Sequence, residues 1–114
     1  MSWRDAERLD DIVAAAEAIT AHTHRGPLSD GLVFDAVRVR LIEIGEAVKA
    51  LDPVLLTSEP DIPWADVAGM LDHLAHRCFD TAHSIVRVTV ENDIPPLAAA
   101  VKRLRRRIPS GDEA

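Results

Sequence analysis

Apolar residues recur three and four positions apart along most of the chain, a spacing that places side chains on one side of an α-helix. The pattern is clearest in two segments, carried by Leu9, Ile12, Val13, Ala16 and Ile19 and then by Phe34, Val37, Leu41, Ile44, Val48 and Leu51. Gly26-Pro27 interrupts it between them, and Ser29 or Asp30 offers the next N-cap. We therefore expect two long amphipathic helices joined by a short loop.

Prolines divide the second half of the chain into shorter predicted helices. Pro53 ends the second helix, and residues 54–60 form a connector in which Leu55-Leu56 allows one helical turn. Pro63 suits the first turn of a third helix, whose apolar side continues through Trp64, Val67, Met70, Leu71 and Leu74.

A fourth helix, capped by Asp80 or Thr81 and containing Ile85 and Val86, is rich in β-branched residues and has the weakest helical pattern. The last helix restarts at Pro95-Pro96 and continues through Leu97, Val101 and Leu104. No strand-turn-strand pattern occurs. The prediction is an all-α, up-and-down bundle of four to five helices, in one domain over residues 1–108 with a flexible tail over 109–114.

Length and composition narrow the class of protein. The 114 residues fit one domain with a single core. Cys78 is the only cysteine, so no internal disulfide can form, which fits a reducing cytoplasm. No apolar run approaches the ~20 residues of a membrane span, and the N-terminal residues are charged where a signal peptide would be apolar. We expect a cytoplasmic protein that does not enter the membrane.

Charge is unevenly distributed along the chain. Residues 1–101 hold 8 basic and 17 acidic side chains, a net charge of −9, against −6 for the whole chain. Five cations then follow within six positions: Lys102, Arg103, Arg105, Arg106 and Arg107. Together with Arg77 they are candidate contacts for RNA phosphates. The alternative is that the cluster complements the dipole at a helix C-terminus.

A stretch of polar residues in the third helix carries the candidate chemistry. Asp72 and His76 are four residues apart, so the carboxylate can orient the imidazole and raise its pKa. Such a histidine is a plausible general acid or base for cleaving a phosphodiester. The alternative is a histidine that only caps the helix or lies on its surface.

A metal-dependent enzyme is a second chemical hypothesis. His73, His76 and His83, with Asp72, Asp80 or Cys78, could supply three or four ligands. Their spacing matches no closed zinc pattern, and no HExxH motif is present. The glycines are scattered and form no phosphate-binding loop, so no cofactor is predicted. A helical module that binds a protein or RNA without catalysis is a third hypothesis.

The order of several motifs resembles that of the HepT-like group of HEPN ribonucleases. The resemblance extends from about residue 5 to 106 and is carried by LIEIGEAVK at 41–49, DIPW at 61–64, Gly69-Met70, DHLAH at 72–76, Phe79-Asp80 and DIPPL at 93–97. It implies a two-fold homodimer and a metal-independent RNA endonuclease, usually the toxin of a two-gene toxin–antitoxin pair. The implied partner is a nucleotidyltransferase (MNT-type) antitoxin.

The family's active motif is an arginine, a polar residue, three further residues, a histidine and then a tyrosine two positions on. When this motif is placed on the present sequence, His76 matches the catalytic histidine and Asp72 matches the polar residue. Leu71 stands in place of the arginine, and Cys78 stands in place of the tyrosine. The resemblance makes that tyrosine the position that the antitoxin adenylylates, and this chain has no tyrosine at all. Since leucine cannot bind phosphate, we expect impaired cleavage, either in a naturally degenerate member or in an inactivated variant.

Overall fold

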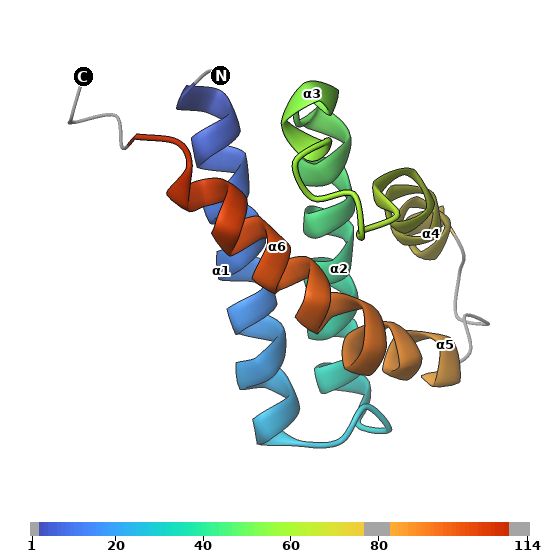
Figure 1. Ribbon diagram of the computed structural model, residues 1–114. Helices are drawn as coiled ribbons and strands as arrows, with labels where there is room; N and C mark the ends of the chain where they lie inside the picture. Colours follow the sequence, from blue (N-terminus) through green and yellow to red (C-terminus); the bar gives the residue numbers. More distant parts are fainter. Residues whose placement is uncertain (1–2, 77–82, 110–114) are drawn as a thin grey trace.

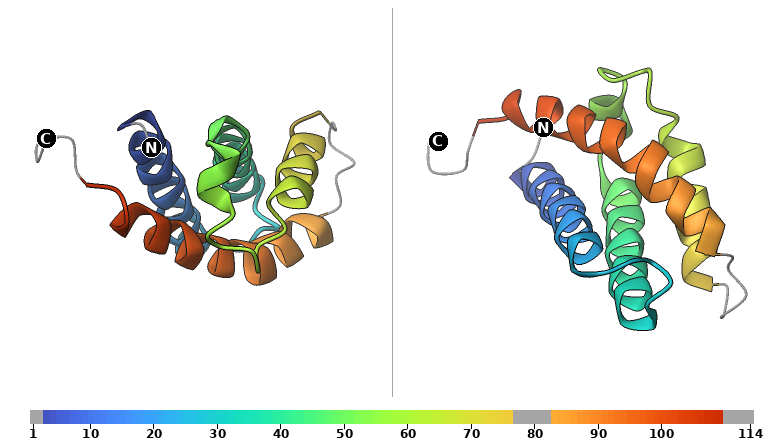
Figure 2. Two further views of the ribbon diagram at one scale, coloured as in Figure 1. Left: turned by 45° about the horizontal axis from the view of Figure 1, so that its top comes forward. Right: turned by 90° about the horizontal axis from the view of Figure 1, so that it is seen from below.

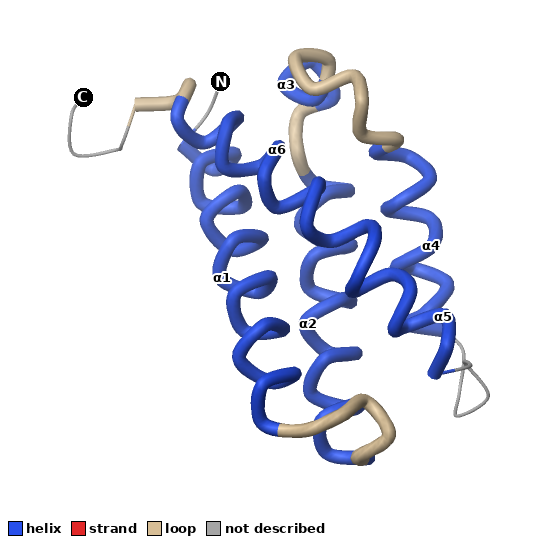
Figure 3. The backbone as a smooth tube through the Cα atoms, turned by 60° about the horizontal axis from the view of Figure 1, so that its bottom comes forward, coloured by secondary structure: helices blue, strands red, loops and turns tan. Residues whose placement is uncertain are grey.

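The computed structural model describes residues 3–76 and 83–109, and within these ranges the chain is helical between short loops (Figures 1 and 3). The elements are α1 (Trp3–Arg25), α2 (Gly31–Ala50), α3 (Pro53–Leu56), α4 (Trp64–His76), α5 (His83–Val88), the π-helical turn η1 (Thr89–Asp93) and α6 (Ile94–Arg106). No strand occurs in the described ranges. The all-α prediction is confirmed.

The helices form two layers around one apolar core. Helices α1, α2 and α4 lie side by side, and the rod made of α5, η1 and α6 crosses them on one face (Figure 2). The predicted apolar positions fill the space between the layers, and Leu9, Ile12, Val37, Leu41, Ile44, Leu97, Val101 and Leu104 are all buried. The hydrophobic pattern therefore identified the inward sides of α1, α2 and α6 correctly.

Side-chain caps fix the starts of α2 and α3. Asp30 Oδ1 accepts hydrogen bonds from the backbone N–H groups of Leu32 (2.9 Å) and Val33 (3.4 Å), so the N-cap of α2 is Asp30. Asp52 caps α3 in the same way, through the Val54 N–H at 3.0 Å. The single turn expected at Leu55-Leu56 is thus a capped helix that begins at Pro53. The predicted cap at Asp80 or Thr81 lies outside the described residues.

The predicted start of the last helix at Pro95-Pro96 is confirmed, because α6 begins at Ile94 with proline in its first turn, but no break precedes it: the chain passes from α5 through η1 directly into α6. Proline lacks the N–H for an α-helical hydrogen bond, and its ring collides with the carbonyl four residues earlier. A π-helical turn is wider and moves that carbonyl away, which lets Pro95 and Pro96 occupy the first turn of α6. The buried Thr89 donates its hydroxyl proton to the Ile85 carbonyl (2.8 Å) at the start of the wide turn.

The helices of the described ranges are too short or too polar for any of them to cross a lipid bilayer.

A glycine sets the distance between α2 and α4. A Cβ placed on Gly45 would lie 2.8 Å from the Cβ of Leu71, closer than two carbon atoms can approach. Leu71 is fully buried at this contact. The two helices can therefore touch only because position 45 has no side chain, and this contact fixes the position of α4, which carries the candidate site.

We expect Gly45→Ala to destabilise the fold, because neither Cβ can rotate away and the backbones must separate. Overpacking of this kind costs about 1–3 kcal/mol. Gly69→Ala on α4 is the matched control, since a Cβ there meets nothing within 4 Å. That change should stabilise the protein by roughly 0.5–1 kcal/mol through the backbone entropy of glycine alone. Urea unfolding measures both, and equal stability of the two variants would contradict the close contact.

Candidate active site

The two sides of α4 differ sharply in polarity. Val67, Ala68, Leu71 and Leu74 are buried against the rest of the bundle. Asp72 and His73 lie on the outer side, where His73 is exposed and Asp72 partly so. His76 is the last residue of α4, one turn beyond Asp72. The side chains of His76 and His83, like Arg77, Cys78 and Asp80, lie outside the part of the chain whose side chains are described.

Asp72 has a basic partner that the sequence analysis did not predict. Lys49 Nζ on α2 lies 3.0 Å from Asp72 Oδ1 and 3.2 Å from Glu46 Oε1. The hydrogen bond to Asp72, followed by that to Glu46, raises the pKa of Lys49 above its ordinary value. Lys49 therefore keeps its charge at neutral pH and links α2 to the outer side of α4. The predicted contact between Asp72 and His76 lies outside the described side chains.

Leu71 lies on the opposite side of α4 from solvent. Its side chain has an exposed fraction of 0% and packs in the α2–α4 interface beside Gly45. The position to which the resemblance assigns an arginine is thus apolar and buried in this chain, and it contributes no positive charge to the site.

A cation from α2 reaches the last turn of α4. The Arg38 guanidinium donates from Nε (3.3 Å) and Nη2 (3.2 Å) to the backbone carbonyl of Leu74, two residues before His76. Carbonyls in the last turn of a helix have no partner within that helix, so Arg38 supplies one. Arg38, Gly45 and Lys49 are spaced seven and four residues apart, which places them on one side of α2. That spacing is visible in the sequence, but the sequence alone does not show that this side of α2 faces α4.

Much of the basic cluster of α6 is engaged within the molecule. Arg103 donates to both carboxylate oxygens of the largely buried Glu59, with Nη2 to Oε1 at 2.7 Å, and Arg107 lies 3.6 Å from the same carboxylate. The hydrogen bond from Arg103 lowers the pKa of Glu59. Arg105 Nε pairs with Asp10 on α1 at 2.8 Å. Arg103, Arg105 and Arg107 therefore hold α6 against the rest of the bundle.

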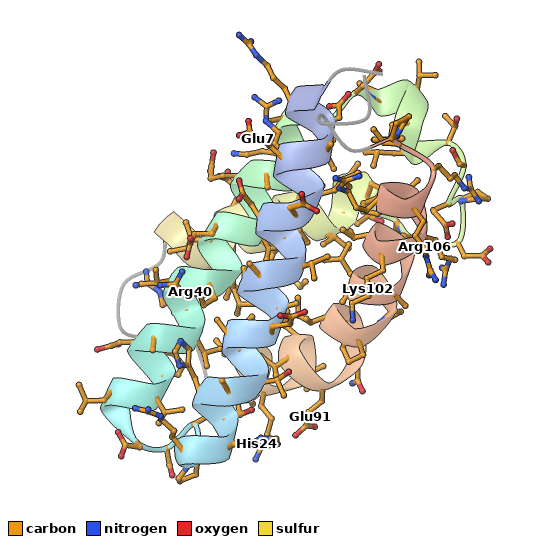
Figure 4. All side chains as sticks on the ribbon, turned by 90° about the vertical axis from the view of Figure 1, so that its left-hand side faces the viewer. Glu7, His24, Arg40, Glu91, Lys102 and Arg106 are labelled. Atoms are coloured by element: carbon orange, nitrogen blue, oxygen red, sulfur yellow. The ribbon has the colours of Figure 1, made fainter. Side chains whose placement is uncertain are left out.

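Lys102 and Arg106 lie on successive turns of α6 (Figure 4). Arg106 Nε donates to the Lys102 carbonyl (3.3 Å), and neither side chain forms an ion pair within the described part of the chain. Of the predicted phosphate contacts on α6, these two are the cations that a ligand could reach without breaking an ion pair of the bundle.

The metal-dependent hypothesis gains no support from the described side chains, among which no three His, Cys, Asp or Glu residues form a group suited to a metal ion. Two members of the predicted ligand set have described side chains: His73 is exposed, and Asp72 pairs with Lys49.

Comparisons with known proteins place the chain among ribonucleases. A family model described as "Ribonuclease HepT-like" matches residues 7–104. A protein of Thermococcus cleftensis named "Probable ribonuclease HepT" is 33% identical over 102 residues, covering 86% of this chain and 93% of its own. A protein of Caldanaerobacter subterraneus named as an RNase is 39% identical over 67 residues, covering 58% of this chain and 60% of its own. No solved structure matches the chain.

Proposed function

Because this chain belongs to the family of HepT-like ribonucleases, we propose that it is the toxin of a type VII (HEPN/MNT) toxin–antitoxin system and cleaves RNA in the cytoplasm. The observation that carries the proposal is the match of the family model over residues 7–104, a range that includes all of α4 and residues 77–82 that follow it in the chain. The acidic body of the molecule argues against general coating of nucleic acid and favours a local site.

In the proposed mechanism, His76 acts as general base and then as general acid. As base it removes the proton of a ribose 2′-hydroxyl, whose oxygen attacks the adjacent phosphorus. As acid it protonates the leaving 5′-oxygen, giving a 2′,3′-cyclic phosphate and a 5′-hydroxyl end. Asp72, one turn before His76, orients the imidazole. No step needs a metal ion.

The same mechanism predicts a low rate for this chain. Negative charge builds on the phosphate oxygens in the transition state, and a preorganised donor there is worth on the order of 10²–10³ in rate. Leu71 is apolar and buried, so it provides no such donor. We propose an impaired enzyme.

We further propose that the protein is a two-fold homodimer in which each His76 approaches its copy. Large apolar side chains support it: on α5, which follows α4 in the chain, Ile85 and Val88 are 48% and 51% exposed, and a second copy would cover such surfaces. The proposed partner of this dimer is a nucleotidyltransferase antitoxin. A light-scattering mass of one chain at micromolar concentration would contradict the dimer.

The function is tested by incubating the purified protein with end-labelled RNA in excess chelator. We expect slow cleavage that chelator does not reduce and that added zinc or magnesium does not accelerate. Cleavage that requires added metal would favour the metal-dependent enzyme. RNA binding with no cleavage under any condition would favour the helical binding module.

A further inference from the structure

We propose that a groove along the seam between α1 and the rod of α5, η1 and α6 binds single-stranded RNA and leads it toward α4. This inference rests on the proposed function, because it assigns a path to the substrate of that enzyme. Figure 4 shows the seam, with Arg106 and Lys102 near one end of it and Glu91 at the other. The groove lies outside the candidate active site described above.

The groove consists of three depressions that adjoin one another. The first, of about 350 Å³, lies between α1 and the C-terminal part of α6, and it shares Val13 and Lys102 with the second, of about 190 Å³. The second shares Thr23 and Val90 with the third, of about 680 Å³, which lies between the α1–α2 loop and the α5–η1 part of the rod. Because neighbouring depressions share their walls, one extended ligand can occupy all three.

Cations stand at both ends of this groove. Lys102 and Arg106 line the end at α6, and Arg87 on α5 lines the opposite end. All three residues are exposed, and none of them forms an ion pair within the described part of the chain. Arg105 also lines the α6 end, but Asp10 balances its charge. A positively charged groove of this kind follows the backbone of a single strand in many proteins that bind one.

Two carboxylates in the groove favour a nucleic acid over an acidic peptide. Glu17 lines the middle of the groove, and Glu91 lines its η1 end. Carboxylates accept hydrogen bonds from the amino groups of bases, whereas they repel the side chains of an acidic peptide. The three cations outnumber these two carboxylates, so the groove is locally positive on a chain whose net charge is −6.

The length of the groove makes one of its ends remote from α4. Arg87 and Arg106 are 19 positions apart on the continuous rod, a distance of about 28 Å at the helical rise of about 1.5 Å per residue. A stacked strand covers that distance with about eight nucleotides. The η1 end touches α4, where Thr89 Oγ1 lies 3.7 Å from Met70 Sδ. A long RNA can therefore reach from α4 to the far end of the rod, and a short one cannot.

The test measures binding of single-stranded RNAs of about 12 and about 4 nucleotides, one longer and one shorter than the groove. Their 2′-O-methyl sugars prevent cleavage. We expect Arg106→Gln and Arg87→Gln each to weaken binding of the longer RNA about 10-fold, the loss of one charge-assisted contact. Each should also reduce the slope of log affinity against log salt by about 0.7. The shorter RNA can still bind at the unchanged end, so it should lose no more than about 2-fold.

Arg40→Gln is the matched control. It removes the same charge from the other side of α1, where Arg40 pairs with Glu43 and lies beside Arg8 and Asp11 (Figure 4). Equal binding of the longer RNA by Arg106→Gln and Arg40→Gln would overturn the proposal. Equal losses for the two RNA lengths would overturn the continuous groove. Arg106→Lys should keep most of the affinity and slope, and a loss as large as that of Arg106→Gln would contradict a role for the charge.

A polyglutamate peptide with as many negative charges as the longer RNA tests the other class of ligand. We expect it to bind more weakly than the RNA, because Glu17 and Glu91 repel it and it offers them no base amino groups. Tighter binding of the peptide would assign the groove to an acidic segment of a protein and overturn the proposal.

The groove and the enzyme can fail separately. If unmodified RNA is cleaved in a His76-dependent manner while Arg106→Gln and Arg87→Gln bind and cleave it like the parent, the ribonuclease function stands and the groove is wrong. If no variant cleaves RNA but both substitutions weaken binding of the longer RNA about 10-fold, the groove stands and the proposed enzyme is wrong.

Discussion

Leu71→Arg is expected to raise the rate of RNA cleavage about 10²–10³-fold, the usual effect of one preorganised donor on a developing negative charge. Leu71 is fully buried against α2, so an arginine there must lay its aliphatic stem along the interface and extend its guanidinium beyond it. We therefore expect a less stable protein that is a faster enzyme, with higher toxicity to the host cell. Rates are measured with end-labelled RNA below the melting temperature of every variant.

Leu71→Met separates charge from packing in this experiment. Methionine keeps a similar volume and an unbranched stem without the charge, so it should leave cleavage at the parent rate. Two results would contradict the account of position 71: a Leu71→Arg protein that is folded but no faster, or a Leu71→Met protein that is as fast as Leu71→Arg.

If the proposed antitoxin exists, Cys78→Tyr is expected to give a chain that it adenylylates, whereas the chain with Cys78 is expected to stay unmodified. The resemblance places the modified phenol two residues after the histidine, and Cys78 has a shorter, softer thiol at that position. Docking should survive in both forms, because it depends on helix surfaces that the substitution leaves unchanged. Each version is incubated with antitoxin, ATP and magnesium, and the intact chains are weighed by mass spectrometry.

The two versions of the chain control for each other. We expect one or more adenylyl units on the tyrosine version and none on the cysteine version. Modification of the cysteine version would show that the phenol is unnecessary. No modification of either version would show that the antitoxin acts by complex formation alone.

Local features of the fold were predictable from the sequence, because helical periodicity and capping depend on residues within one or two turns. The apolar positions of α1, α2, α4 and α6 and the cap at Asp30 are of this kind. Local reasoning also placed the start of α6 at the prolines, but it did not predict that the chain enters α6 from α5 without a break. The π-helical turn keeps the rod continuous there, and its wider spacing leaves no separate signal in the hydrophobic pattern.

Contacts between helices were not predictable, since they depend on how the helices cross. Lys49–Asp72, Arg38–Leu74 and Arg103–Glu59 join residues 23, 36 and 44 positions apart. Through these contacts Asp72 has a basic partner, and part of the basic cluster of α6 that was expected to bind RNA is engaged within the molecule. The spacing of Arg38, Gly45 and Lys49 places them on one side of α2. Only the structure shows that α4 packs against this side.

The central claim is that this chain cleaves RNA through His76, and the most direct measurement compares His76→Ala with His73→Ala in chelator. His73 lies one turn earlier on α4 and is exposed, so its variant controls for loss of a histidine from the same helix. We expect His76→Ala to reduce cleavage at least about 10²-fold, His73→Ala to leave it near the parent rate, and the products to end in 2′,3′-cyclic phosphate. Equal cleavage by both variants, or products ending in a 3′-hydroxyl, would contradict the mechanism.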